Sequence, residues 1–241
     1  MMKNDCKGPL TRTMNSLLLL AVTLFTFTAC LNNNDGTPIP PAAFVSFYHG
    51  APDAPGLDIQ VDNRRITNNS FNFTEYINYN RFFTGNRAFR FSAFNAVNTL
   101  LDTTLTFQVD KAYSIFLADE VAALKALVVE DIWTDPTEGN AKFRGVHLSP
   151  DTEGIILEIT EDETEETLEL DFMEASSFES LPQGNYTFTV KNAEGETLVS
   201  AQDIEIRSNR IYSLVFRGFQ TPPAENSNGL SLQLITNHII F

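Results

Sequence analysis

Short runs in which apolar and polar residues alternate, or in which apolar residues are continuous, recur along the first half of the chain, and both patterns predict β-strands. The runs are AFVSFY (43–48), LDIQVD (57–62), RAFRFSAF (87–94), TLTFQV (104–109), AYSIFLA (112–118) and ALVVEDIW (126–133). Gly, Pro, Asn and Asp residues separate them, as expected of turns. Only DEVAALKA (119–126) favours a helix, and NFTEYINYNRFF (72–83) is expected to form a turn or short helix.

The second half of the chain has the same pattern. Its runs are FRGVHL (143–148), IILEIT (155–160), TLELDF (167–172), NYTFTVKN (185–192), QDIEIR (202–207), IYSLVF (211–216) and LSLQLIT (230–236). Six or seven short strands in about a hundred residues are typical of a β-sandwich of immunoglobulin-like shape. The analogy concerns architecture alone, because the Cys, Trp and Cys spacing of antibody domains is missing. The pattern therefore predicts an all-β protein.

The two halves are copies of one module. HGAPDAPG recurs as HLSPDTEG, so that His49, Pro52, Asp53 and Gly56 reappear 98 residues later as His147, Pro150, Asp151 and Gly154. GNRAFRF (85–91) and DKAYSIF (110–116) each recur 99 residues on, as GNYTFTV (184–190) and NRIYSLV (209–215). We predict two tandem immunoglobulin-like β-sandwich modules, 43–137 and 138–241, which meet near TDPTEGNA (134–141).

The repeated turn has a structural and a chemical interpretation. Structurally, the proline fixes φ, the aspartate accepts backbone N–H groups in an Asx-type turn, and the glycine takes a positive φ. The histidine then ends the preceding strand and bonds across the turn. Chemically, a His and Asp pair can bind metal or act as acid and base. The structural interpretation is favoured because both modules carry the set and His238 is the only other histidine. We expect no catalytic residue, metal or cofactor.

The N-terminus resembles a secretory signal. Three basic residues precede the apolar run SLLLLAVTLFTFTAC (16–30), which is too short for a permanent membrane span. Thr28, Ala29 and Cys30 resemble the lipobox of bacterial lipoproteins, although Phe27 replaces the usual aliphatic residue. We predict a lipoprotein signal peptide (1–29), lipidation of Cys30 and a flexible tether (30–42), which would anchor the chain to a membrane. The alternative is an ordinary signal peptide with a coincidental cysteine.

The net charge of the chain limits the kinds of partner that it can bind. The formal net charge of −15 argues against nucleic acid, which needs clustered Lys and Arg. Phosphate-cradling loops, nucleophile elbows, HExxH motifs and paired cysteines are absent from the sequence.

The acidic stretch TEDETEETLELD (160–171) raises the alternative of a calcium site, but its spacing differs from that of an EF-hand loop. We expect this stretch to be the solvated tip of a hairpin whose charges discourage edge pairing.

Aromatic side chains are the main candidates for ligand binding. FNFTEYINYNRFF (71–83) places Phe71, Phe73, Tyr76 and Tyr79 among Asn and Arg residues, a composition that suits stacking on a sugar ring or on another protein. Packing in the core of the module is the alternative, because aromatic residues are chiefly buried. Trp133, near the end of the first module, is expected to pack near the linker.

The stretches FVSFYHGAPDAPGLDIQVDN (44–63) and AKFRGVHLSPDTEG (141–154) resemble the bacterial domain-of-unknown-function family 4397, which often carries tandem His-Ala-Ser-Pro-Asp-Ala-Pro motifs. In the second copy Glu153 replaces the last proline. The resemblance implies extracytoplasmic, often lipid-anchored β domains, as in lipoproteins of Bacteroidetes, and no established reaction.

These observations together favour a non-catalytic lipoprotein of the bacterial cell envelope, anchored in the outer membrane at either its periplasmic or its surface face. Its tandem modules would serve in binding or adhesion, with a glycan or a protein as ligand. One alternative is a structural spacer without a ligand. The other is an extracytoplasmic enzyme. It would need a cleft that contains a histidine and a carboxylate, and the sequence of neither module indicates one.

Overall fold

In the first module, strands pair into two four-stranded sheets, ordered β4-β1-β7-β8 and β3-β2-β5-β6. The computed structural model describes residues 40–162 and 164–239. The strands are β1 (Ala42–His49), β2 (Leu57–Val61), β3 (Arg64–Arg65), β4 (Tyr76–Phe83), β5 (Gly85–Ala93), β6 (Thr99–Phe107), β7 (Ala112–Ala118) and β8 (Lys125–Glu130). The two sheets enclose a core rich in phenylalanine, which includes Phe47, Phe89, Phe91 and Phe107.

The second module repeats this plan. One sheet has the order β11-β10-β14-β15, and the other has the order β12-β9-β16-β17 with β13 also paired to β9. The strands are β9 (Asn140–His147), β10 (Ile155–Glu161), β11 (Thr164–Leu170), β12 (Glu174–Ala175), β13 (Glu179–Pro182), β14 (Gly184–Lys191), β15 (Thr197–Ile206), β16 (Arg210–Arg217) and β17 (Ser231–Ile239). Their inward side chains form a second core around Phe143 and Phe188.

Pairing registers show that the two modules are equivalent. Strand β1 runs parallel to β7, and β9 runs parallel to β16 in the same way. Ala42 pairs with Phe83 in the first module, and Asn140 pairs with Pro182 in the second. Every strand pairing in the described part of the chain joins strands of one module. The predicted all-β class with tandem sandwiches is therefore confirmed.

One local prediction is wrong, and another is right only in part. DEVAALKA forms only a single 3-10 turn, Val121–Ala123, before β8 begins at Lys125. NFTEYINYNRFF begins with a turn, in which Glu75 N donates to Asn72 O at 2.9 Å, but the rest of it is the eight-residue strand β4, which pairs along β1. In both places, pairing with a neighbouring strand outweighs the local preference of the sequence.

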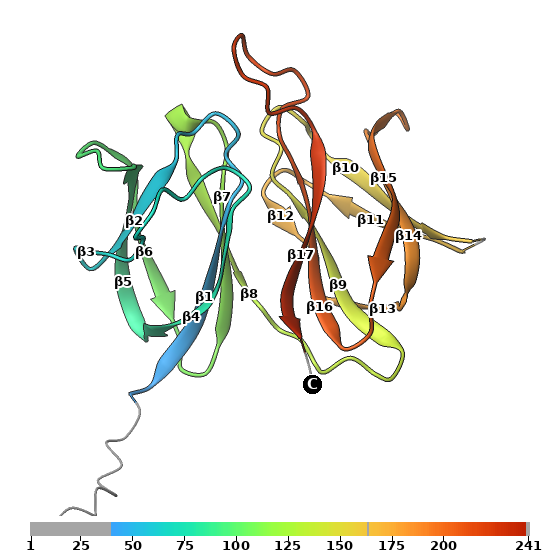
Figure 1. Cartoon of the computed structure of the whole chain (residues 1–241), viewed down its shortest axis with the longest axis horizontal. Coiled ribbons are helices and arrows are strands. Elements are labelled where there is room, and N and C mark those ends of the chain that lie inside the picture. The colour runs from blue at the N-terminus through green and yellow to red at the C-terminus, as the bar shows by residue number, and fades with distance from the viewer. Residues whose placement is uncertain (1–39, 163, 240–241) are drawn as a thin grey trace, which may run out of the picture. The chain divides into compact units, whose positions relative to one another are not determined.

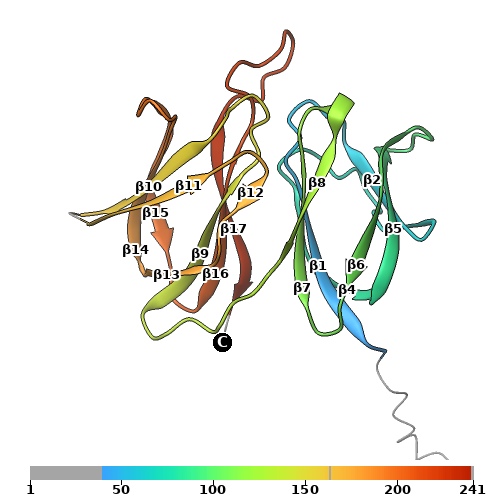
Figure 2. The same ribbon diagram turned by 180° about the vertical axis from the view of Figure 1, so that it is seen from behind.

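Sheets β4-β1-β7-β8 and β12-β9-β16-β17 face each other (Figure 1). Between them, side chains of both sheets bury a third apolar cluster. Its buried members are Tyr48, Phe116, Ala118, Val146, Leu148, Val215 and Ile235. Figure 2 shows the chain passing from β8 of the first module to β9 of the second. Residues from Pro41 onward cluster as one compact unit, in agreement with this shared core.

A buried ion pair lies within this junction. Arg144, whose side chain is 1% exposed, donates through Nη1 to Asp131 Oδ1 at 2.6 Å. Its Nη2 donates to Ser114 Oγ at 3.0 Å, and its Nε donates to Ser213 Oγ at 2.8 Å. Because Asp131 and Ser114 precede the linker whereas Arg144 and Ser213 follow it, the guanidinium joins the two modules.

The predicted signal peptide, Cys30 and almost all of the tether lie outside the described residues. Within the described residues, no helix is long and apolar enough to cross a membrane. All paired strands and all three buried clusters begin at residue 42 or later, so a chain that starts at Asn32 contains the complete described fold.

We expect separate chains of residues 43–137 and 138–241 each to give a β-type circular dichroism spectrum and a cooperative melt, because each contains both of its sheets and its own core. Each should be less stable than the joined chain, since separation exposes the apolar junction and breaks the buried ion pair. Thermal melts of the three chains test this. Two unfolded fragments that regain structure only when mixed would contradict it.

Candidate functional site

The first repeated turn is built around a buried histidine. His49 ends β1, is fully buried, and its Nε2 lies 3.2 Å from the carbonyl oxygen of Pro55. Its ring packs against Phe71 at a centroid distance of 5.6 Å and against Phe73 at 6.3 Å. The histidine therefore bonds across the turn, as its position in the sequence suggests.

The second turn repeats this arrangement. His147 ends β9, and its Nε2 lies 2.9 Å from the carbonyl oxygen of Glu153. Ser149 N donates to the other ring nitrogen, Nδ1, at 3.2 Å. Because Nδ1 accepts a hydrogen bond in this contact, Nε2 carries the hydrogen that is donated to the carbonyl oxygen of Glu153. The ring is thus a neutral imidazole whose two nitrogens are both used by the turn.

The two aspartates accept backbone hydrogen bonds, but not within the expected Asx-type turns. Asp53 Oδ1 accepts a hydrogen bond from Val121 N at 2.7 Å. Asp151 accepts from the backbone N–H groups of Gln220 and Thr221, both at 2.8 Å. Each carboxylate therefore ties its turn to the loop between the last two strands of the same module, whereas an Asx-type turn would place the bond within the turn itself.

The glycines also differ from expectation. Neither Gly56 nor Gly154 is among the residues with positive φ. A Cβ on Gly56 would lie 1.8 Å from Ser70 Oγ, and one on Gly154 would lie 3.1 Å from Asp171 Oδ1. Close packing against Ser70 and Asn72, rather than backbone conformation, favours glycine at position 56.

Burial lowers the pKa of His49 to about 4, and the hydrogen bond to Pro55 offsets this only in part. Burial likewise lowers the pKa of His147. Unfolded histidines take up protons below about pH 6.5, whereas the folded His49 does so only near pH 4. The free energy of unfolding should therefore fall as the pH drops from about 6.5 to about 4, by on the order of 3 kcal/mol for His49.

Urea unfolding at several pH values tests this expectation. His49→Gln, which removes the titrating group, should flatten the decline over that range. A decline of the same size in the variant would contradict the assignment to His49.

Each His and Asp pair is thus held by contacts within its own module. Among the residues that the structure describes, no group of three or more His, Cys, Asp or Glu side chains is placed to hold a metal ion. Residues 160–162 and 164–171 of the acidic stretch include the end of β10 and all of β11, which pair as neighbouring antiparallel strands. Strand β11 lies at the edge of its sheet, in line with the interpretation of its charges.

The four candidate aromatic residues do not share one exposed face. Phe71 is buried in the first core, whereas Phe73 is partly exposed and lies 5.1 Å from the guanidinium carbon of Arg217. Tyr76 packs against the junction cluster, and Tyr79 donates its hydroxyl to Asp131 Oδ2 at 2.7 Å. Most of this aromatic segment therefore serves the core and the junction.

Trp133 likewise packs across the junction. Its ring lies 6.0 Å from that of Tyr79 in the first module and 5.7 Å from that of Phe178 in the second. The tryptophan thus lies near the linker, as expected, with both modules in contact.

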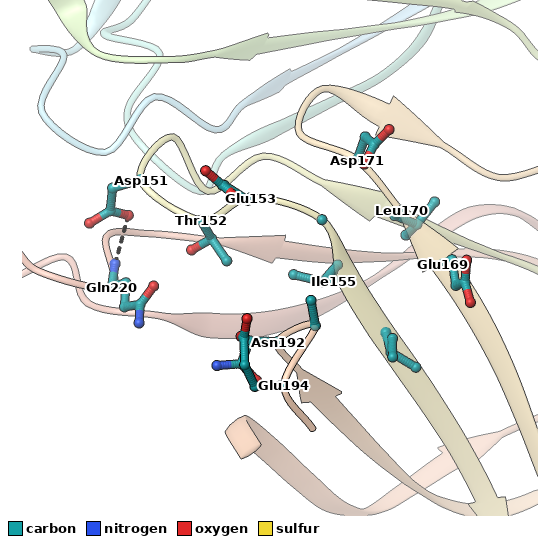
Figure 3. A pocket seen from close by; sticks show the side chains of 13 residues that line it. Asp151, Thr152, Glu153, Ile155, Glu169, Leu170, Asp171, Asn192, Glu194 and Gln220 are labelled. Carbon is teal, nitrogen blue, oxygen red and sulfur yellow. Dashed lines mark hydrogen bonds between the residues drawn. The ribbon is translucent and has the colours of Figure 1, made fainter. Parts of the chain in front are cut away.

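The second turn borders a groove of about 660 Å³ (Figure 3). Three segments line it: residues 151–156 of the turn and β10, residues 169–171 of β11, and residues 192–194 between β14 and β15, with Gln220 at the rim. Its carboxylates are those of Asp151, Glu153, Glu169, Asp171 and Glu194. Ile155 and Leu170 supply apolar surface. The groove therefore offers many hydrogen-bond acceptors above a small apolar patch.

The sequence predicts one side of this groove but not the others. The repeated motif identifies the turn at 151–154 as an unusual segment. Asn192 and Glu194 lie in an ordinary turn that nothing in the sequence links to the motif. The second module holds 18 of the 31 acidic residues, and this excess is the one signal in the sequence that could have indicated the groove.

Comparisons with known proteins give one match to a family model, whose description states no function. The model of a family described as "Domain of unknown function (DUF4397)" matches residues 43–158, which span the first module and the repeated turn of the second. The match supports assignment of this region to that family. No curated protein matches the sequence.

Among solved structures, the chain is similar to the crystal structure of CBMbc (family CBM26) from Eubacterium rectale Amy13K in complex with maltoheptaose. The sequence identity is 10% and the TM-score is 0.24, with 81% of this chain and 97% of that chain covered.

Proposed function

We propose that the chain is a non-catalytic lipoprotein of the bacterial cell envelope that binds a glycan or a protein ligand through its second module. The groove beside the second turn is the observation that supports binding. Three loop or strand-end segments meet there at one end of a sandwich, and loops carried by a rigid scaffold are where binding residues concentrate. In this proposal residues 43–241 form two copies of the domain-of-unknown-function module.

The chemistry of the groove suits a ligand rich in donors. Carboxylates such as those of Glu153 and Glu194 accept hydrogen bonds from sugar hydroxyls and, more strongly, from Lys or Arg side chains. Ile155 and Leu170 offer apolar contact beneath them. A hydroxyl-rich glycan and a basic protein segment both satisfy these groups, and the charge of the groove favours the latter at low ionic strength.

The proposed attachment of the chain to a membrane is inferred from the N-terminal sequence. Lipidation of Cys30 would attach the chain to the outer membrane, and the 11 residues from Leu31 to Pro41 would separate the anchor from β1. Fully extended, they reach about 36–40 Å. Such a tether would hold the groove within reach of envelope glycans or of neighbouring envelope proteins.

A glycan array and a pull-down from envelope extracts, both with the soluble chain from Asn32, test the binding role. The proposal predicts a retained ligand whose affinity falls about tenfold or more in Glu153→Ala combined with Glu194→Ala. Glu165→Ala, on the exposed edge strand β11, is the matched control and should bind as the unchanged chain does. Equal binding by both variants would place the ligand elsewhere.

A structural spacer is the second candidate function. The buried Arg144–Asp131 pair favours it, because a fixed angle between modules is what a spacer needs. A chain that retains no ligand in either assay, but whose modules keep a fixed orientation in solution, would support the spacer over the binding protein.

A further inference from the structure

The first module contains a second concave site, far in sequence from the groove just described. A cleft of about 650 Å³ opens between its two sheets, at the edge formed by β3 and β4. Phe47, Val61, Ile77 and Phe82, which also pack against the core of the module, line its apolar part. The cleft therefore gives a ligand access to surface that is normally sealed inside a sandwich.

Large apolar side chains continue from the cleft to the surface. Phe83 is 66% exposed and Ile66 is 40% exposed, and both line the opening. Exposed apolar residues of this size that adjoin an apolar cleft mark a binding surface more often than scattered ones do. An apolar chain could thus enter the cleft and stay covered along its length.

The charge of the opening is opposite to that of the protein. Arg64, Arg81 and Arg87 line the cleft, and Asp62 is the one carboxylate among the lining residues, whereas the whole chain has a net charge of −15. Asp62 neutralises one of these charges, since its Oδ2 lies 2.8 Å from Arg87 Nη1.

Arg64 and Arg87 have hydrogen-bond donors without a partner among the described residues. The guanidinium of Arg64 has no ion pair or hydrogen bond with any residue in 40–162 or 164–239. Nε of Arg87 is buried and also lacks a hydrogen-bond partner within those residues. The exposed guanidinium of Arg64 can therefore pair with a bound anion without breaking a described contact.

The second module shows what the same place looks like when it is closed. Phe82 and Phe83 pair with Ala43 and Ala42, and Leu181 and Pro182 take the same register against β9. Arg87 faces Leu105, and in the equivalent position Tyr186 faces Ile204.

The equivalent cavity holds only about 100 Å³. Its charged lining residues are Glu161 and Glu166, so its charge is reversed. Two copies of one module thus differ in volume and in sign of charge at the same position, which the shared fold does not require.

We propose that the cleft of the first module binds a single-chain amphiphile with an anionic head group, such as a fatty acid or an alkyl phosphate. The apolar part of the cleft would bury the alkyl chain, and burial is favourable in proportion to the apolar area removed from water. The guanidinium groups at the opening would pair with the carboxylate or phosphate, for which their planar donors are suited. The cleft volume falls in the usual range for small-molecule sites.

Equilibrium dialysis of radiolabelled myristate against the soluble chain from Asn32, below the micelle-forming concentration, tests this proposal. We expect saturable binding of one myristate per chain. Tetradecyltrimethylammonium, with the same tail and a cationic head, and acetate, with the head alone, should each compete at least about tenfold less well than unlabelled myristate.

Two variants locate the site. Arg64→Glu, at an exposed position without a described partner, should weaken myristate binding about tenfold or more. Arg90→Glu makes the same change of charge on an exposed residue of the same module outside the cleft and should leave binding unchanged. Circular dichroism melts of both variants establish that they fold.

Three outcomes would overturn the proposal. They are the absence of saturable myristate binding, equal competition by the cationic amphiphile, and equal affinities of the two variants. Binding to vesicles of anionic phospholipid in the absence of binding to free myristate would mean that the arginines meet a membrane surface, and would also overturn it.

Discussion

Replacement of Asp131 by alanine is expected to lower the free energy of unfolding by about 3–5 kcal/mol. The change removes the carboxylate whose Oδ1 lies 2.6 Å from Arg144 Nη1 and leaves that guanidinium buried without its counter-charge. Tyr79 and Ser114 would also lose the acceptor of their hydroxyl hydrogen bonds. Urea unfolding followed by far-ultraviolet circular dichroism measures the loss.

Two further variants, one control and one rescue, complete the test. Glu130→Ala breaks the neighbouring but exposed pair with Lys111 and should cost less than about 1 kcal/mol. Adding Arg144→Met to Asp131→Ala removes the uncompensated charge, so the double variant should regain part of the lost stability. A loss in Asp131→Ala no larger than that in Glu130→Ala would show that the junction pair is not stabilising.

Replacement of Cys30 by alanine is expected to abolish incorporation of labelled palmitate and processing at that site. The expectation follows from the apolar run that ends at Thr28, Ala29 and Cys30. Without acyl chains the polypeptide loses the membrane affinity that each buried CH₂ contributes, about 0.8 kcal/mol per group. Metabolic labelling in the native host, followed by membrane fractionation, gives both readouts.

Cys6 supplies the matched control, because it lies within the predicted signal peptide. Cys6→Ala should label and fractionate as the unchanged chain does. Labelling that persists in Cys30→Ala would contradict the lipoprotein proposal, and it would leave the binding sites of the two modules untouched.

Most strands were predictable because their residues either alternate between apolar and polar or form a short, continuous apolar run. AYSIFLA coincides with β7, and the repeated turns lie where the motif places them. Strand β4 was not predicted because YINYNRFF has no clear alternation of apolar and polar residues. A bulge between Val45 and Phe47 also shifts the register of β4 against β1. Its extended form is set by pairing with β1, which local sequence does not report.

The junction was harder to foresee. Arg144 lies in a run that predicts a strand, yet nothing in that run indicates that its guanidinium is buried. Its partner Asp131 belongs to the other module, and Ser114 and Ser213 come from two further strands. Packing of one module on the other creates this polar centre, so the pattern within either module cannot predict it.

The candidate sites were predictable only in part, for the same reason. The second turn was identified by its motif, but the groove needs Glu194 and Gln220 from distant loops. The cleft of the first module depends on the shortness of β3, Arg64–Arg65, compared with the seven-residue strand β11 of the second. Such differences between the copies become visible only when their pairing registers are compared.

We expect the junction to make the two modules one cooperative unit that carries both sites. Differential scanning calorimetry of the soluble chain from Asn32 measures this cooperativity. One transition is expected, with calorimetric and van't Hoff enthalpies that agree. Two separate transitions, unchanged by Asp131→Ala, would contradict it.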